Sequence, residues 1–172
     1  MSLIIEPFVS KKHRRDKFDC GVDSLNRYIQ KQASQDVKKK ISTVFVLIDS
    51  SDANVMAYYS LSAYTICLAE LDESIIKRLP RYPLLPATLL GRLAVDVRHK
   101  GKRLGELMLI DALKKSLLAT ATVASLAVIV EAINEAAASF YRKYGFQEFK
   151  SNNSRLYLPM QSIAKLDLNI DT

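Results

Sequence analysis

The pattern of residues 88–118 predicts a strand that leads through a basic glycine turn into a helix. The apolar run from Thr88 to Asp96 predicts a buried strand, in which Gly91 indicates a bulge or a close backbone approach. From Leu104 to Leu118, apolar residues recur at the spacing of a helix with one apolar face. A strand joined in this way to a helix indicates a mixed α/β fold.

The rest of the chain continues this mixed pattern. Hydrophobic periodicity predicts the order β-α-β-β-α-β-α-β-α-β-β, with an antiparallel middle and no internal repeat. Pro83 and Pro86 are expected to keep the residues before Thr88 extended or looping. The predicted strands are residues 3–9, 43–49, 55–67, 88–96, 123–130, 146–149 and 155–158, and the predicted helices are 23–39, 71–79, 104–118 and 134–144.

Length and composition favour one soluble domain. The chain has 172 residues, 49% of them hydrophobic, and can bury a core without disulfides or metal, so we expect a single domain over 1–172. Its start lacks the form of a secretory signal, and no apolar run approaches the roughly 20 residues of a membrane-spanning helix. Cys20 and Cys67 are not spaced as metal ligands. We therefore expect a cytoplasmic protein with no metal and no membrane attachment.

Positive charge is concentrated near the N-terminus. The formal net charge is +7, and residues 1–40 hold ten Lys and Arg against five Asp and Glu, leaving 15 against 13 for the rest. Such a field suits an anionic partner such as RNA or a nucleotide cofactor, and a solvated face without a partner is the alternative.

The turn after the buried strand has the chemistry of an anion site. Backbone N–H groups at a helix start point outward with the positive end of the helix dipole, and a glycine allows a phosphate to approach closely. The turn is neither a Walker loop nor a Gly-x-Gly-x-x-Gly dinucleotide turn, and an ordinary basic helix start is the alternative. Positive charge around a pyrophosphate would come from Arg98, Lys100, Lys102 and Arg103.

This turn resembles the Arg/Gln-x-x-Gly-x-Gly/Ala motif of the GNAT acetyltransferases, which lies at the same strand-to-helix junction. Residues 98–103 match at the first and fourth positions, and Arg103 departs at the sixth. The resemblance implies an α/β GNAT fold: a single mixed, largely antiparallel central sheet with a splayed central strand pair, flanked by helices. It also implies acetyl-CoA as acetyl donor, with the strand before the turn presenting backbone groups to the pantetheine arm.

A second GNAT hallmark follows about 40 residues later, where Phe140 to Phe146 completes the pattern Phe-Tyr-x-x-x-Gly-Phe. The resemblance implies that the Tyr141 hydroxyl lies near the sulfur of acetyl-CoA and protonates the departing thiolate. A phenol with a reference pKa of about 10 is protonated at neutral pH and can act as a general acid. Core packing is the alternative, and it describes Phe140 and Phe146 better than Tyr141. The residues that the resemblance assigns to the coenzyme are Leu93, Ala94, Val95, Arg98, His99, Lys100, Gly101, Lys102, Arg103, Leu104, Gly105, Asn134, Ala137 and Phe140.

The sequence gives little support for a nucleophilic side chain that would carry the acetyl group. Cys20 and Cys67 have no neighbouring histidine in a recognisable pattern, and His13 and His99 lie in basic runs, where we expect them to be solvated. Direct attack of an amine on the thioester is therefore the favoured chemistry. An α-amino group, with a reference pKa near 7.7, is partly neutral at pH 7, so the absence of an evident base favours an α-amine acceptor over a lysine-like one.

Three further segments, which are residues 18–28, 90–96 and 156–160, resemble the GNAT toxins of bacterial toxin–antitoxin pairs. The resemblance covers nearly the whole chain and implies acetylation of the amino acid on charged tRNA, with a ribbon-helix-helix antitoxin as partner. Arg92 would contact the acceptor, and an ion pair is its alternative role. Such toxins often dimerise, and the sequence leaves a homodimer open. An acetyltransferase of a small amine or of a protein amino terminus, and a non-enzymatic binding module, are the competing interpretations.

Overall fold

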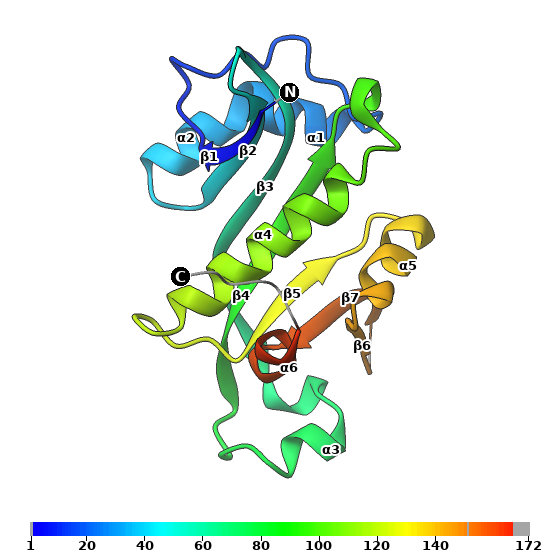
Figure 1. Ribbon diagram of the computed structural model, residues 1–172. Helices are drawn as coiled ribbons and strands as arrows, with labels where there is room; N and C mark the ends of the chain where they lie inside the picture. The colour runs from blue at the N-terminus through cyan, green and yellow to red at the C-terminus, as the bar shows by residue number, and fades with distance from the viewer. Residues whose placement is uncertain (1, 151, 167–172) are drawn as a thin grey trace. The chain divides into compact units, whose positions relative to one another are not determined.

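The computed structural model describes residues 2–150 and 152–166. Its strands pair in one sheet in the order β1-β2-β3-β4-β5-β7-β6, and helices flank the sheet, which confirms a mixed α/β fold (Figure 1). The strands are β1 (Leu3–Pro7), β2 (Thr43–Asp49), β3 (Asp52–Cys67), β4 (Leu84–Val95), β5 (Ala127–Glu131), β6 (Gln147–Phe149) and β7 (Asn152–Pro159). The helices are α1 (Asp23–Arg27), α2 (Ala33–Lys38), α3 (Glu73–Ile76), α4 (Leu104–Ala119), α5 (Glu135–Lys143) and α6 (Met160–Lys165). Three tighter or wider turns complete the path: the π-helical turn η1 (Tyr28–Gln32) and the 3₁₀ turns η2 (Leu68–Glu70) and η3 (Val97–His99).

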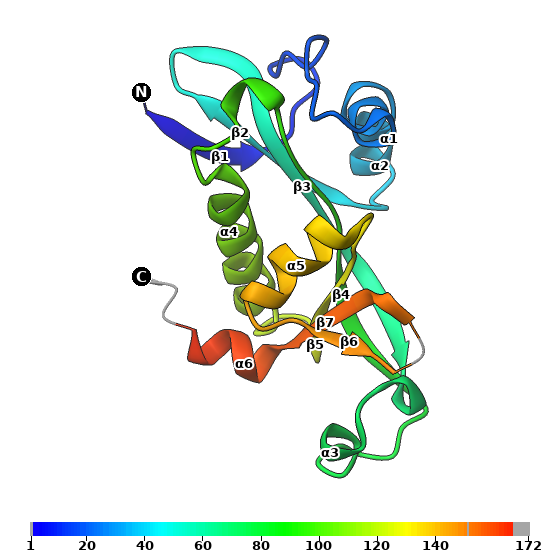
Figure 2. The same cartoon turned by 90° about the vertical axis from the view of Figure 1, so that its right-hand side faces the viewer.

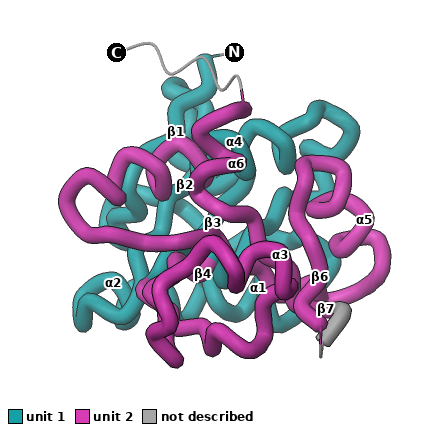
Figure 3. The backbone as a smooth tube through the Cα atoms, turned by 90° about the horizontal axis from the view of Figure 1, so that it is seen from below, with its two compact units in different colours: residues 1–62, 90–112 teal, residues 63–89, 113–172 magenta. Residues whose placement is uncertain are grey.

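The backbone groups into two compact units (Figure 3). The first contains Met1–Ser62 and Leu90–Ala112, and the second contains Ala63–Leu89 and Leu113–Thr172. Each unit therefore joins segments that are far apart in sequence. Within them, β1 pairs with β2, β2 with β3, and β7 with both β5 and β6, all antiparallel. A single domain over the whole chain and a splayed central strand pair stay predictions.

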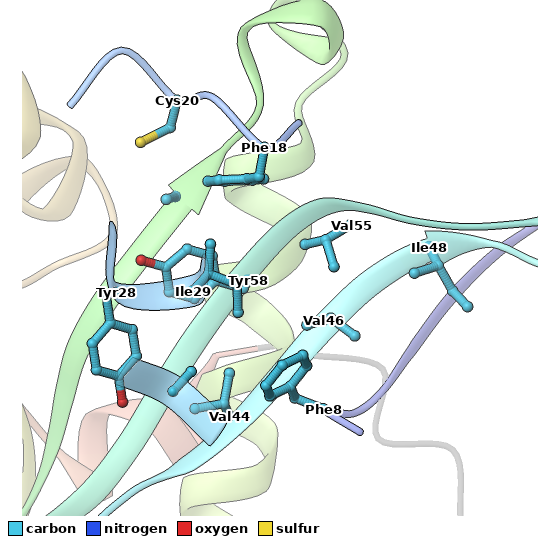
Figure 4. Close-up of a cluster of buried hydrophobic side chains, with 12 residues drawn as sticks. Phe8, Phe18, Cys20, Tyr28, Ile29, Val44, Val46, Ile48, Val55 and Tyr58 are labelled. Carbon is cyan, nitrogen blue, oxygen red and sulfur yellow. The ribbon is translucent and has the colours of Figure 1, made fainter. Parts of the chain in front are cut away.

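The core of the first unit follows from strand alternation. In β2, Val44, Val46 and Ile48 share one face and pack with Ile29 of η1 and Tyr58 of β3 (Figure 4). Successive residues of a strand point to opposite faces, so the neighbouring Tyr58 and Tyr59 of β3 contact different elements. The Tyr58 hydroxyl donates to the Leu25 carbonyl at 2.6 Å, whereas the Tyr59 hydroxyl donates to Asp111 Oδ2 at 2.5 Å. Helix α1 and the first half of α4 therefore cover opposite faces of β3 (Figure 2).

The second unit has its own core on β5 and β7. Ala127 and Ile129 alternate along β5, and the rings of Phe149 and Tyr157 pack with their centroids 4.9 Å apart. Ile66 and Leu85, from the ends of β3 and β4 that belong to this unit, complete the cluster. Helix α5 packs on β7 in the same unit.

Several element boundaries differ from the sequence-based prediction. Strand β4 begins at Leu84 and includes Pro86, whose carbonyl accepts from Leu126 N–H at 2.9 Å; a proline can accept in a ladder although it cannot donate. The strand predicted from Val123 begins only at Ala127, because turn hydrogen bonds to the end of α4 hold Thr122 and Val123. The helix predicted over 71–79 is reduced to α3, and α6 was not predicted.

No helix of the described ranges is long and apolar enough to cross a membrane.

The hydrogen bond from Tyr58 to the backbone gives a stability test. Tyr58→Phe leaves the Leu25 carbonyl without this donor, and we expect the free energy of unfolding to fall by about 1–2 kcal/mol. Tyr82→Phe is the matched control, since the Tyr82 side chain is 65% exposed and should change stability by less than about 0.5 kcal/mol. Urea unfolding followed by circular dichroism measures both, and equal effects of the two substitutions would contradict the assignment.

Candidate functional site

The glycine turn after β4 is built from left-handed residues. The chain leaves β4 at Val95, makes the short turn η3 and enters α4 at Leu104. Gly101 has φ +82° and Arg103 has φ +58°, so both lie in the region that favours glycine. The N–H groups of Gly101 and Lys102 donate to no described residue. Together with the unpaired N–H groups of the first helical turn, they form a backbone surface suited to an anion.

A buried carboxylate fixes the start of this turn. Asp96 is fully buried, and its Oδ1 accepts from the Arg98 N–H at 2.9 Å and from Arg98 Nε at 3.0 Å. Its Oδ2 accepts from Arg98 Nη2 at 2.9 Å and from the Asp19 N–H at 3.1 Å. Burial raises the pKa of Asp96, but the bonds from Arg98 and Asp19 outweigh it and lower the pKa to about 2. Asp96 is therefore ionised throughout the physiological range.

Arg98 therefore binds a carboxylate of the protein itself. Its backbone N–H and two of its guanidinium nitrogens are used by Asp96, although the side chain is still 53% exposed and can face an anion with its remaining donors. Lys102 Nζ lies 3.4 Å from His99 Nδ1. Lys100, Lys102 and Arg103 are exposed around the turn. The assignment of these side chains to a pyrophosphate stays a prediction.

The loop before α1 is tied to the same carboxylate. The Asp19 carbonyl accepts from the Val97 N–H at 2.8 Å, and its side chain accepts from Gly21 N–H and from Asn26 Nδ2. Asn26 Oδ1 in turn accepts from the Cys20 N–H at 2.8 Å. Residues quoted above for their resemblance to a toxin motif therefore hold a loop in shape. Burial raises the pKa of the Cys20 thiol, which opposes thiolate formation and agrees with its rejection as a nucleophile.

The turn between Val95 and Leu104 is called the anion turn below. Arg92 lies on β4 just before it. Its guanidinium carbon is 3.5 Å from the centre of the Tyr28 ring, a close cation–π contact. Within the described ranges the guanidinium forms no ion pair and donates no hydrogen bond, so the alternative role of ion-pair partner is not observed there.

In the second unit, helix α5 holds Tyr141. Asn134 caps this helix, since its Oδ1 accepts from the Ala137 N–H at 2.8 Å, and Arg142 pairs with Glu135 and Glu148 on the exposed side. The Tyr141 side chain is 7% exposed and packs on Phe140 and Phe146, and its hydroxyl bonds to no described residue.

Burial raises the pKa of Tyr141 to about 12. The phenol is therefore fully protonated at neutral pH, with a proton available for transfer.

A basic groove in the first unit was not located by sequence reasoning. It has a volume of about 490 Å³. Two of its lining residues are fixed, since Gln30 Nε2 donates to the Phe18 carbonyl and the backbone of Arg14 pairs with that of β3. We use the name basic groove for the residues His13, Arg14, Arg15, Asp16, Gln30 and Lys31.

The expectation that His13 is solvated is wrong. His13 is buried, its Nδ1 accepts from the Val9 N–H, and its Nε2 lies 2.7 Å from Glu6 Oε1. Because Nδ1 accepts, Nε2 carries the proton and donates to Glu6. His13 therefore anchors the basic loop to β1 instead of serving as a surface charge.

Comparison with known proteins identifies the family. The model of a family described as Acetyltransferase (GNAT) domain matches residues 62–148. The chain belongs to the GNAT acetyltransferases. This acetyltransferase is 28% identical over 149 residues to the tRNA-acetylating toxin of Mycobacterium tuberculosis, with 87% of each chain covered.

Solved structures of the toxin AtaT have the same fold. AtaT complexed with acetyl-methionyl-tRNAfMet matches this acetyltransferase with a TM-score of 0.88 and 29% identity, over 95% of this chain and 98% of AtaT. A tyrosine-to-phenylalanine mutant of AtaT bound to the C-terminus of the antitoxin AtaR and acetyl-CoA matches with a TM-score of 0.80 and 25% identity, over 95% and 96%.

The buried Asp96 predicts an acid-sensitive contribution to stability. Its pKa in the folded protein, about 2, lies below the unfolded value of about 3.9, so the contribution is present above about pH 4 and is lost as the pH falls towards 2. We expect Asp96→Asn to lower the free energy of unfolding by about 2 kcal/mol at pH 7 and by much less at pH 2.5. Urea unfolding at both pH values measures this, with the exposed Asp16→Asn as control. A constant effect of Asp96→Asn across this range would contradict the assignment.

The two left-handed residues predict effects of opposite sign. A Cβ on Gly101 would meet no atom within 4 Å, so Gly101→Ala costs only backbone strain, which we expect to lower the free energy of unfolding by about 1 kcal/mol. Arg103→Gly relieves the same strain and should raise it by up to about 1 kcal/mol. Chemical denaturation of both variants beside the wild type tests this, and a change of the same sign in both would refute it.

Proposed function

We propose that this acetyltransferase uses acetyl-CoA to acetylate the α-amino group of the amino acid on charged tRNA, and that it thereby blocks translation as a toxin. The observation that carries the chemistry is the buried, protonated Tyr141 with an unpaired hydroxyl on the capped helix α5. The acceptor is inferred from the relatives, since one is named a tRNA-acetylating toxin and another was solved with acetyl-methionyl-tRNAfMet.

The anion turn fits the pyrophosphate of acetyl-CoA. Two unpaired N–H groups, at Gly101 and Lys102, meet the start of α4, and exposed lysines surround them. In this proposal Leu93, Ala94 and Val95 of β4 present backbone groups to the pantetheine arm. Asn134 uses its oxygen to cap α5, which leaves its amide nitrogen free to donate to the same arm.

When bound, acetyl-CoA supplies a thioester carbon that the neutral α-amine of the acceptor attacks, so that a C–N bond forms and the C–S bond breaks. Tyr141 then has one task, which is to pass the proton on its hydroxyl to the leaving sulfur. The acceptor nitrogen loses its surplus proton to solvent. No covalent attachment to the protein is needed, which agrees with the buried Cys20 thiol.

The basic groove supplies positive charge for the tRNA backbone. Arg15 is held in place by bonds from Nη1 to the Ser10 and His13 carbonyls, and Arg14 and Lys31 line the same groove. Such contacts bind nucleic acid phosphates without reading sequence.

Because charged tRNA is the substrate, the proposal places the protein in the cytoplasm. It also includes a ribbon-helix-helix antitoxin as partner, since AtaT was solved with the C-terminus of its antitoxin.

Removal of the Tyr141 hydroxyl tests the proposed chemistry. We expect Tyr141→Phe to lower kcat by about 10²- to 10⁴-fold, because the leaving thiolate loses its proton donor, while acetyl-CoA binding is retained. Transfer of labelled acetyl groups to a pool of charged tRNAs measures the rate, and calorimetry measures binding. Tyr144→Phe, one turn further along, is the matched control and should retain activity. Transfer by the wild type to small amines, with none to any charged tRNA, would refute the acceptor.

The raised pKa of Tyr141 gives a pH test. A general acid whose pKa is about 12 stays protonated to well above pH 10, so loss of the Tyr141 proton should not limit kcat between pH 7 and pH 10. We expect kcat in this range to rise with deprotonation of the acceptor amine and then to remain level. A fall in kcat with an apparent pKa below 10 that is absent in Tyr141→Phe would contradict this role.

A further inference from the structure

Arg92 is a guanidinium without a hydrogen-bond acceptor, held in one place. Its side chain is half-buried, and it rests on the Tyr28 ring at 3.5 Å, close enough for the ring face to replace part of its hydration. Within residues 2–150 and 152–166, none of its donors is taken by an acceptor. A guanidinium fixed through its face keeps its edge free, and that edge is the part that binds phosphate or carbonyl oxygens.

The Tyr28 ring is itself fixed at both ends. The side chain is 4% exposed and stacks on Tyr58 with a centroid distance of 6.1 Å (Figure 4). Its hydroxyl donates at 2.9 Å to Oδ2 of Asp36, a buried carboxylate that also accepts from Gln32 Nε2 at 3.0 Å. Donation to a carboxylate enriches the ring in electrons, which strengthens its attraction for a cation.

The π-helical turn makes this hydrogen bond possible. In a regular α-helix, residues eight apart differ by about 80° around the axis, and residues seven apart by only about 20°. In η1 the Ala33 N–H bonds to the Tyr28 carbonyl, five residues back, which inserts one extra residue into the turn. Tyr28 and Asp36 therefore align as if seven apart, two turns along one face. A regular helix over the same residues would move Asp36 away from the tyrosine hydroxyl.

We propose that Tyr28, oriented by Asp36 through the π turn, is a positioning residue that holds Arg92 for contact with an oxygen of the charged tRNA acceptor. This inference rests on the proposed function, because it needs a tRNA acceptor. Tyr28 itself does not touch the substrate. Its effect passes through the guanidinium, so it changes acceptor binding and leaves the acetyl donor alone.

The test is a double-mutant cycle on the full chain with Tyr28→Leu, Arg92→Ala and the pair, scored as KM for charged tRNA and KM for acetyl-CoA. We expect Tyr28→Leu to raise the tRNA KM by about 2- to 30-fold, the range of a cation–π contact, with the acetyl-CoA KM unchanged. In the Arg92→Ala background, Tyr28→Leu should have no further effect on the tRNA KM. Tyr28→Phe retains the ring but loses the hydrogen bond to Asp36, so we expect it to raise the tRNA KM by less than Tyr28→Leu does.

Because Tyr28 lies in the core, a variant that keeps its shape guards against misfolding. Phenylalanine analogues with increasing numbers of ring fluorines at position 28 weaken the negative ring face while leaving the packing similar, and the tRNA KM should rise with each fluorine. The inference would be overturned, with the proposed function intact, if Tyr28→Leu had equal effects with and without Arg92. A tRNA KM that did not change with fluorination would have the same consequence. Absence of transfer to charged tRNA by the wild type would overturn the proposed function, and this inference with it.

Discussion

The buried carboxylate of Asp96 is the interaction on which the first unit is organised. A fully buried charge costs several kcal/mol unless it is paired, and here Arg98 and the Asp19 N–H supply four donors. Those donors come from two places in the sequence, the turn that follows β4 and the loop that precedes α1. One side chain therefore fixes both the entry to the anion turn and the loop that leads to the π turn.

Around Asp96, the residue that fixes the backbone differs from the residues that present positive charge to solvent. Arg98 neutralises Asp96, whereas Lys100, Lys102 and Arg103 are exposed and carry the field at the turn. The same division recurs in α5, where Asn134 caps the helix, Arg142 links Glu135 to Glu148, and the buried face is left to aromatic rings. Helix α5 is thus held by polar contacts on its exposed side, and Tyr141 needs no hydrogen bond of its own to stay in place.

Local patterns were enough to predict most elements, and the failures have both local and non-local causes. Strand β2 was predicted with its observed bounds, because Val44, Val46 and Ile48 alternate without interruption. Periodicity also indicated one helix over 23–39, but a single inserted residue at Tyr28–Gln32 leaves the average spacing nearly unchanged, so the π turn was invisible. His13 lies in a basic run, and the run does not reveal that its buried ring stacks on Phe8 and bonds to Glu6 of β1. The residues of the anion turn and of α5 were predicted from motifs, whereas the partner of Arg92 lies 64 positions away in the sequence.

The burial of Tyr141 also bears on how the proposed enzyme would return to its starting state. A thiol such as that of cysteine has a pKa of about 8.5, well below the value of about 12 for this phenol, so a tyrosinate left after proton transfer is the stronger base of the two. It would recover a proton from water without help from another side chain. A weak acid in an apolar setting is thus recharged after every turnover, and the site can operate without a dedicated residue for that step.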